Sequence, residues 1–176
     1  MEEYVPIYAR FYEHLKSHSE YLMPYMNRQA SCEKWMQGEL IRYLYDCKRT
    51  GKINEADLEK NYGRRAGYCD IWFKVQGKEI WCELEVIVTN YGKSGKPITN
   101  QVDHVIEDAA KLKNCPENAE RLLMFLAYPF ARGGRNDDAW KMHMNKIESS
   151  SELVMNPFSI PIDELHEARI YLARSK

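Results

Sequence analysis

Three acidic residues lie in two short apolar segments of the chain, where charged side chains are unexpected. Asp70 belongs to residues 68–75, and Glu83 and Glu85 belong to residues 79–88; both segments are rich in Ile, Val, Trp and Phe. Because side chains of a strand alternate between its faces, Glu83 and Glu85 project from the same face. Close carboxylates repel one another and are costly to bury unpaired, so a divalent cation, protonation or an arginine must neutralise them.

The chemistry that these residue types suggest is the binding of a hard divalent cation such as Mg²⁺ or Mn²⁺, which takes carboxylate oxygens as ligands. The alternative is that the acids lie on an exposed sheet face and are merely solvated. In the cation-free state, their repulsion is expected to raise the pKa of at least one of them.

A tight-turn signal, Gln76-Gly77-Lys78, separates the two segments and predicts a β-hairpin that places the three acids on adjacent strands. Pro24 and Asn27 are expected to break the chain between the first two helices, and Ser31 to cap the second. Apolar periodicity predicts the other elements. These are helices over residues 2–18, 31–48, 99–113 and 137–149, a buried strand over 121–128, a strand near 153–155 and a C-terminal helix from about 162. Residues 52–62 are charged and ambiguous, and a short exposed edge strand is compatible with them.

Length and composition indicate one globular domain over residues 1–176, and the predicted helices and strands make it α/β. Hydrophobic residues make up 44% and charged residues 29% of the chain, and no apolar run approaches the ~18 residues that cross a bilayer. The first residues are acidic where a secretory signal would be basic, so no membrane partner and a cytoplasmic location are expected. The five cysteines include no C-x-x-C pair and are expected to be reduced, and His14 and His18 are expected on a solvated helix face.

The order of these elements resembles that of the PD-(D/E)XK superfamily of restriction-endonuclease-like nucleases. The resemblance covers residues 31–128, with Gly67-Tyr68-Cys69-Asp70-Ile71 and Glu83-Leu84-Glu85 on the two hairpin strands. It implies an α-β-β-β-α-β core with a mixed sheet flanked by helices. Residues 1–30 would be a helical N-terminal extension and residues 129–176 would be C-terminal additions.

The resemblance also implies roles for individual residues. Asp70 is similar in position to the metal-binding aspartate and Glu83 to the acidic residue of the (D/E)xK half-motif, with the backbone carbonyl of Leu84 as a further ligand. Glu39 is similar in placement to a helix glutamate that holds a metal or its bound water in many members. Gln101 falls where some members place a polar residue near the phosphate.

Two residues depart from the family pattern. Cys69 stands in place of the proline before the aspartate, and Glu85 stands in place of the lysine that polarises the attacking water. Some members carry E-x-E, with the second glutamate as a ligand or a base. A lysine can also move to another element, and the candidates are Lys111, Lys93 and Lys96, each of which is otherwise an ordinary surface lysine.

The resemblance therefore implies a Mg²⁺- or Mn²⁺-dependent nuclease that acts on DNA rather than RNA, as an endonuclease or an exonuclease. Loops at residues 90–97 and 131–136, the latter with Arg132 and Arg135, would contact backbone phosphates. The net charge of −1 and the missing lysine favour an alternative, a catalytically inactive nuclease-fold scaffold that binds nucleic acid or a protein. A plain structural α/β domain is the third reading. The oligomeric state stays open, and a homodimer is compatible with the sequence.

Overall fold

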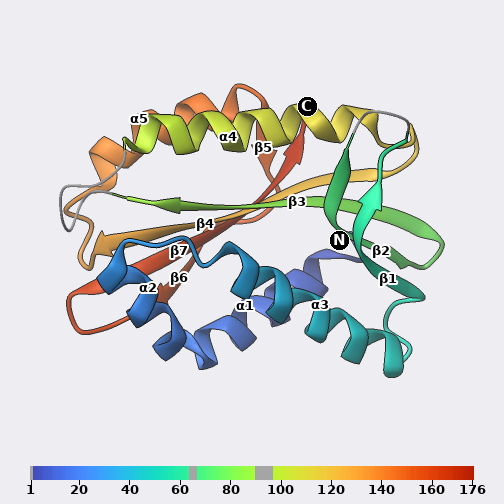
Figure 1. Cartoon of the computed structure of the whole chain (residues 1–176), viewed down its shortest axis with the longest axis horizontal. Helices are drawn as coiled ribbons and strands as arrows, with labels where there is room; N and C mark the ends of the chain where they lie inside the picture. Colours follow the sequence, from blue (N-terminus) through green and yellow to red (C-terminus); the bar gives the residue numbers. More distant parts are fainter. Residues whose placement is uncertain (1, 64–66, 90–96) are drawn as a thin grey trace.

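The computed structural model describes residues 2–63, 67–89 and 97–176, in which an N-terminal helical part is followed by a sheet with helices packed on it (Figure 1). The helical elements are α1 (Val5–Ser17), η1 (Ser19–Tyr21), α2 (Leu22–Arg28), α3 (Glu33–Arg49), α4 (Ile98–Lys111), η2 (Leu112–Asn114) and α5 (Asp137–Glu148). The strands are β1 (Glu55–Asn61), β2 (Tyr68–Val75), β3 (Lys78–Val88), β4 (Glu120–Ala131), β5 (Ser151–Leu153), β6 (Phe158–Pro161) and β7 (His166–Ser175).

The described strands form one mixed, curled sheet of seven strands in the order β1-β2-β3-β4-β7-β5, with β6 also paired to β7. The pair β3 and β4 is parallel and the other pairs are antiparallel. A parallel pair needs a crossover connection, and α4 lies between β3 and β4 in the chain. The elements from α3 to β4 therefore follow the order α-β-β-β-α-β.

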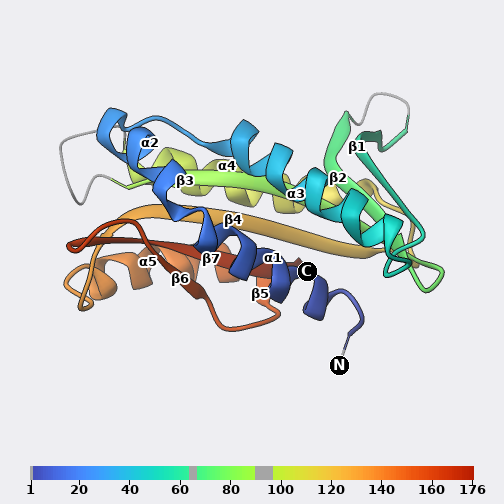
Figure 2. The same cartoon turned by 90° about the horizontal axis from the view of Figure 1, so that it is seen from below.

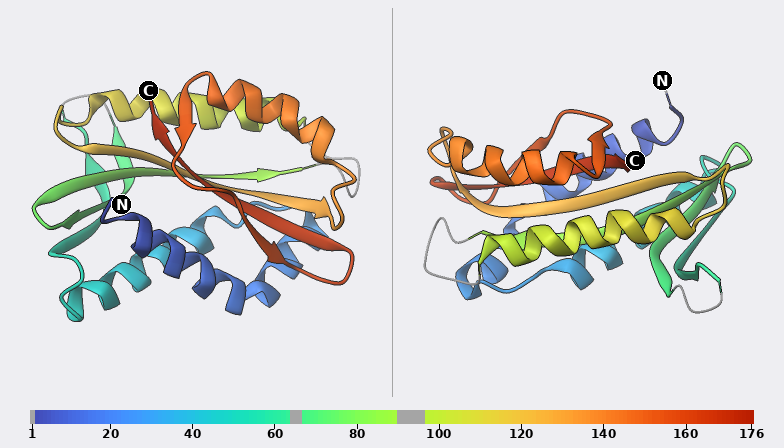
Figure 3. Two further views of the ribbon diagram at one scale, coloured as in Figure 1. Left: turned by 180° about the vertical axis from the view of Figure 1, so that it is seen from behind. Right: turned by 90° about the horizontal axis from the view of Figure 1, so that it is seen from above.

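Helices cover both faces of the sheet: α1, α2 and α3 lie on one face, and α4 and α5 lie on the other (Figures 1 and 3). The alternation along β4 shows how the core is divided. Leu122, Met124 and Leu126 pack into the cluster on the α1–α3 side, while Leu123 and Phe125 pack into the cluster on the α4–α5 side. The continuous apolar run of β4 is therefore buried on both faces, as predicted.

The predicted hairpin, edge strand, buried strand and helices α1, α3, α4 and α5 are all present, with ends shifted by a few residues. The predicted break at Pro24 and Asn27 is wrong, because both residues lie inside α2. Pro24 is in the first turn of that helix, where a backbone N–H has no helical partner to lose. The cap of α3 is Cys32 rather than Ser31, although Ser31 Oγ accepts a hydrogen bond from Glu33 N–H at 3.2 Å.

The predicted C-terminal helix is also wrong, since residues 158–161 and 166–175 form β6 and β7. Pairing with β4, β5 and β6 places β7 well inside the sheet. Ile170 and Leu172 pack on the α1–α3 side and Tyr171 on the other. Burial on both faces thus overrides the helix propensity of this Glu-, Ala- and Leu-containing segment. The strand expected near 153–155 lies two residues earlier, at Ser151–Leu153.

None of the helices in the described ranges has both the length and the apolar character needed to cross a membrane.

A pair of identical substitutions tests the position of β7. Leu172 is fully buried and Leu165, in the turn before β7, is 71% exposed. We expect Leu172→Ala to lower the free energy of unfolding by about 2–5 kcal/mol because it leaves a cavity in the core. Leu165→Ala should change it by no more than about 0.5 kcal/mol. Urea denaturation measures both, and equal small effects would contradict a buried β7.

Candidate functional site: an acid pocket beside β3

The register of the hairpin brings the predicted acids together. The pairing of β2 with β3 starts at the turn with Val75 and Lys78 and ends with Ile71 and Cys82. In the same register, Asp70 and Glu83 are the next two residues to face each other. The backbone N–H of Leu84 donates a hydrogen bond to Asp70 Oδ2 at 2.9 Å. The acids line one cavity of about 270 Å³, here called the acid pocket. Its charged lining includes Glu33, Asp70, Glu83, Glu85, Asp108 and Lys111.

Beyond Cys82, β3 has no partner strand on its β2 side among the described residues, because β2 continues along β1 instead. Side chains take the place of a neighbouring strand at this open edge. Three alternate N–H groups of β3 each donate to a side-chain oxygen: Leu84 to Asp70 at 2.9 Å, Val86 to Glu85 at 2.8 Å and Val88 to Gln101 at 2.7 Å.

Glu83 is the most deeply buried acid of the pocket, with 2% of its surface exposed. Burial, and then its hydrogen bond to Asp70, raise the pKa of Glu83 to about 8. Tyr62 O–H donates to Glu83 Oε1 at 2.5 Å, and its ring stacks on Trp81 with centroids 5.3 Å apart. The expected upward shift of a pKa is therefore confirmed, with burial as a larger cause than repulsion.

The neighbouring acids are shifted in the same direction. Burial raises the pKa of Glu85 to about 7, against the lowering effect of the Val86 N–H. Burial also raises the pKa of Glu33 from α3 and of Asp108 from α4. The pocket therefore holds acids from both faces of the sheet, whose ionised forms are unfavourable without a positive partner.

Lys111 is a positive group at this pocket. Its ammonium forms an ion pair with Asp108, one turn earlier on α4, and that hydrogen bond raises the pKa of Lys111. The charges of Glu83 and Asp70 contribute in the same direction. Of the three lysine candidates, Lys111 is thus placed at the acids, while Lys93 and Lys96 lie outside the described residues.

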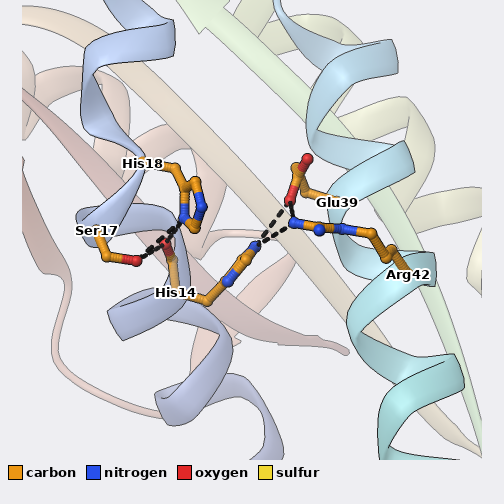
Figure 4. Close-up of polar contacts among 5 residues, drawn as sticks. All are labelled: His14, Ser17, His18, Glu39 and Arg42. Carbon is orange, nitrogen blue, oxygen red and sulfur yellow. Dashed lines mark hydrogen bonds and ion pairs between the residues drawn. The ribbon is translucent and has the colours of Figure 1, made fainter.

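Glu39 does not join this group. Its Oε2 lies 2.7 Å from His14 Nε2 on α1 and 2.5 Å from Arg42 Nη2, so its carboxylate bridges α1 and α3 (Figure 4). Glu39 lies six positions after Glu33 on α3. Since each position of an α-helix is rotated by about 100°, the two side chains point about 120° apart around the helix axis. Glu33 therefore occupies the place expected for Glu39. His14, expected on a solvated face, contacts that acid instead.

Gln101 also differs from its expected role. Its Oε1 accepts from the N–H of Val88, and its Nε2 donates to the carbonyl of the same residue at 2.9 Å. Both ends of the amide are engaged with the backbone, so Gln101 holds α4 against the end of β3. Of the two phosphate-contact loops, residues 90–96 lie outside the described ranges. In the other loop, Arg132 donates to the carbonyl of Asp163, away from the acid pocket.

Sequence reasoning missed Asp108 and Tyr62 as members of the site. Asp108 was detectable, because it shares the apolar face of α4 with Val105, Ala109 and Leu112, and it is only 7% exposed. Tyr62 had no local signal, since it follows the end of the exposed strand β1. The five cysteines are free and buried, as a structural role requires.

The carboxylate oxygens and the Leu84 backbone of the pocket are ligands that fit a hard divalent cation, and they lie beside the side chains of His104 and Lys111. In the part of the chain that the structure describes, no group of three or more His, Cys, Asp or Glu side chains is already arranged around an ion position. A cation would have to displace the protons that the raised pKa values of Glu83 and Glu85 indicate.

Comparisons with protein-family models, with curated proteins and with solved structures found no match to this chain. The acid pocket is therefore the basis for inferring what the protein does.

The raised pKa of Glu83 makes stability dependent on pH. Its folded-state pKa of about 8 lies above the ordinary 4.5, so the folded protein binds this proton more tightly than the unfolded chain does. The stabilisation is complete below about pH 4.5 and is lost as pH rises through about 8. With EDTA present, the wild type should lose roughly 2–4 kcal/mol of unfolding free energy from this group between pH 5 and 9.

Glu83→Gln removes this titration and should be more stable than the wild type at pH 9, with a smaller difference at pH 5. Glu152→Gln, the same change at an exposed position on β5, serves as the control and should follow the wild type. Urea titrations at the two pH values measure the difference. A pH-independent gap between Glu83→Gln and the wild type would show that Glu83 is ionised throughout.

Proposed function

We propose that the protein is a divalent-metal-dependent nuclease of the PD-(D/E)XK type that hydrolyses phosphodiester bonds in DNA. The observation that carries the proposal is the meeting of Asp70 and Glu83 on adjacent strands of a hairpin, in a pocket that residues of α3 and α4 also line. The element order from α3 to β4 supports it, because it is the order of that superfamily's core.

Asp70, Glu83 and the carbonyl of Leu84 would hold a Mg²⁺ or Mn²⁺ ion, with Glu85 completing the metal-binding group. The ion, when bound, polarises the scissile phosphate and lowers the pKa of a bound water. Glu85 accepts the proton of the attacking water or holds a second ion. Glu33, rather than Glu39, would have the role of the helix glutamate, because it lines the acid pocket.

Lys111 would take the role of the motif lysine that Glu85 replaces. Its ammonium is placed at the acid pocket by its bond to Asp108, and about half of the side chain is exposed. It can therefore offset negative charge where an anionic phosphate approaches the acids. This position on α4, rather than on β3, lets Glu85 occupy the motif position without leaving the pocket wholly anionic.

Cleavage of DNA tests the proposal directly. With Mn²⁺ or Mg²⁺, the purified protein should cut DNA, and EDTA should stop it. Asp70→Asn should lower the rate at least about 100-fold, since it removes a charged ligand. Asp138→Asn, the same change at an exposed position of α5, should leave it unchanged. Bound Mn²⁺ without cleavage of DNA or RNA would leave the inactive scaffold as the function, and absence of both would end the metal proposal.

The two glutamates of α3 provide a matched test of which one belongs to the site. Glu33→Gln should weaken Mn²⁺ binding about tenfold or more, because it removes a carboxylate from the pocket. Glu39→Gln should leave Mn²⁺ affinity unchanged, since that carboxylate contacts His14 and Arg42. Isothermal titration calorimetry measures both affinities. Weaker binding in Glu39→Gln alone would restore the role expected from sequence.

A further inference from the structure

A second cavity adjoins the acid pocket at the carboxyl end of β3. Its volume is about 700 Å³, which falls within the range of about 300–1,000 Å³ usual for small-molecule sites. Glu33, Glu85 and His104 line both cavities, so the two are parts of one groove along the open edge of β3. The residues that line this second cavity come from the end of α2 and the segment that joins it to α3, from the end of β3 and from the first turns of α4. Figure 2 shows these elements at one end of the sheet.

Besides the Glu33, Glu85 and His104 side chains that it shares with the acid pocket, this cavity has apolar surface of its own. Val86, Val88 and Pro97 supply apolar surface, while Asn100 and Arg28 supply polar groups. A nucleobase has the matching chemistry, because its faces are apolar and its edges carry hydrogen-bond donors and acceptors. A second metal ion would instead need the concentrated charge of the acid pocket.

We propose that this cavity, here called the base cavity, binds an unpaired nucleotide next to the scissile phosphate, so that the substrate is single-stranded DNA or a single-stranded tail. The inference rests on the proposed nuclease function, which places the scissile phosphate at the acid pocket. A base stacked and paired inside a duplex cannot enter such a cavity unless it is unpaired. Arg28 is exposed and can pair with the phosphate of the bound nucleotide.

The hydrogen bonds along the open edge of β3 argue against an extended peptide as the ligand of this groove. A peptide that added a strand to this edge would need the N–H and C=O groups of β3. The N–H groups of Leu84, Val86 and Val88 are already bonded to side chains, and Gln101 also takes the carbonyl of Val88. An incoming ligand therefore meets side chains rather than an open backbone edge.

Binding of labelled DNA tests the base cavity apart from catalysis. The probes are a fluorescein-labelled 12-nucleotide single strand and a blunt duplex of the same sequence, each measured by anisotropy in EDTA, where the proposed cleavage does not occur. The single strand should bind about tenfold more tightly than the duplex, given the usual contribution of base contacts. Equal affinities would overturn the inference.

Filling the cavity provides the matched variant. Asn100→Trp places a large side chain in the base cavity and should weaken single-strand binding about tenfold, with duplex binding unchanged. Met142→Trp puts the same side chain on a position of α5 that is 69% exposed and should have no effect. Arg28→Met, which removes the charge and the N–H donors but keeps an unbranched side chain, should weaken single-strand binding and its salt dependence, whereas Arg49→Met on the far end of α3 should not.

The outcomes separate the two proposals. Wild-type single-strand affinity in folded Asn100→Trp and Arg28→Met proteins overturns the base cavity, and Mn²⁺ binding with cleavage then leaves the nuclease proposal standing. A single-strand preference that Asn100→Trp abolishes, in a protein that neither binds Mn²⁺ nor cleaves, supports the cavity as a nucleic-acid site and overturns the nuclease proposal. Thermal unfolding midpoints equal to that of the wild type establish that each variant is folded.

Discussion

The burial of the Glu83 carboxyl group is the constraint on which the rest of the site depends. A carboxylate inside a sheet is tolerated only if it is protonated or has positive and hydrogen-bonding partners. The hairpin register supplies Asp70 beside it, and the end of β1 supplies the hydroxyl of Tyr62. Neither neighbour is positive, and both Asp70 and burial raise the pKa of Glu83. The local structure thus favours a proton or a cation at this position.

The pocket exists because β2 pairs with β3 over only five residue pairs next to the turn, whereas its pairing with β1 extends as far as Tyr68. This separation opens one edge of β3 in the middle of the sheet. Glu33 then approaches from α3 on one face, and Asp108 and Lys111 approach from α4 on the other. A sheet in which β2 and β3 stayed paired to their ends would cover this edge, and the acids would have no shared cavity.

The parts of the site that could be predicted from sequence are those set by local periodicity. The two-residue repeat of Glu83 and Glu85, the turn at Gly77 and the apolar run of β4 each specify their own structure. The choice between Glu33 and Glu39 could not be made, because both lie on α3 and only tertiary packing decides which side of that helix meets the hairpin. The prediction of a C-terminal helix is wrong for the same reason, because the pairing of β7 with β4 outweighs the local helix propensity of that segment.

The hydrogen bonds along the open edge of β3 have a consequence for solubility and for evolution. An exposed strand edge is a template for pairing with other chains, and Asp70, Glu85 and Gln101 close it by occupying its N–H groups. Two of these side chains are also members of the acid pocket. A variant in which Asp70 and Glu85 were replaced would still need hydrogen-bond acceptors at these positions to keep the edge closed. Asparagine and glutamine satisfy that need, so these two positions are expected to stay polar even where the negative charge is not kept.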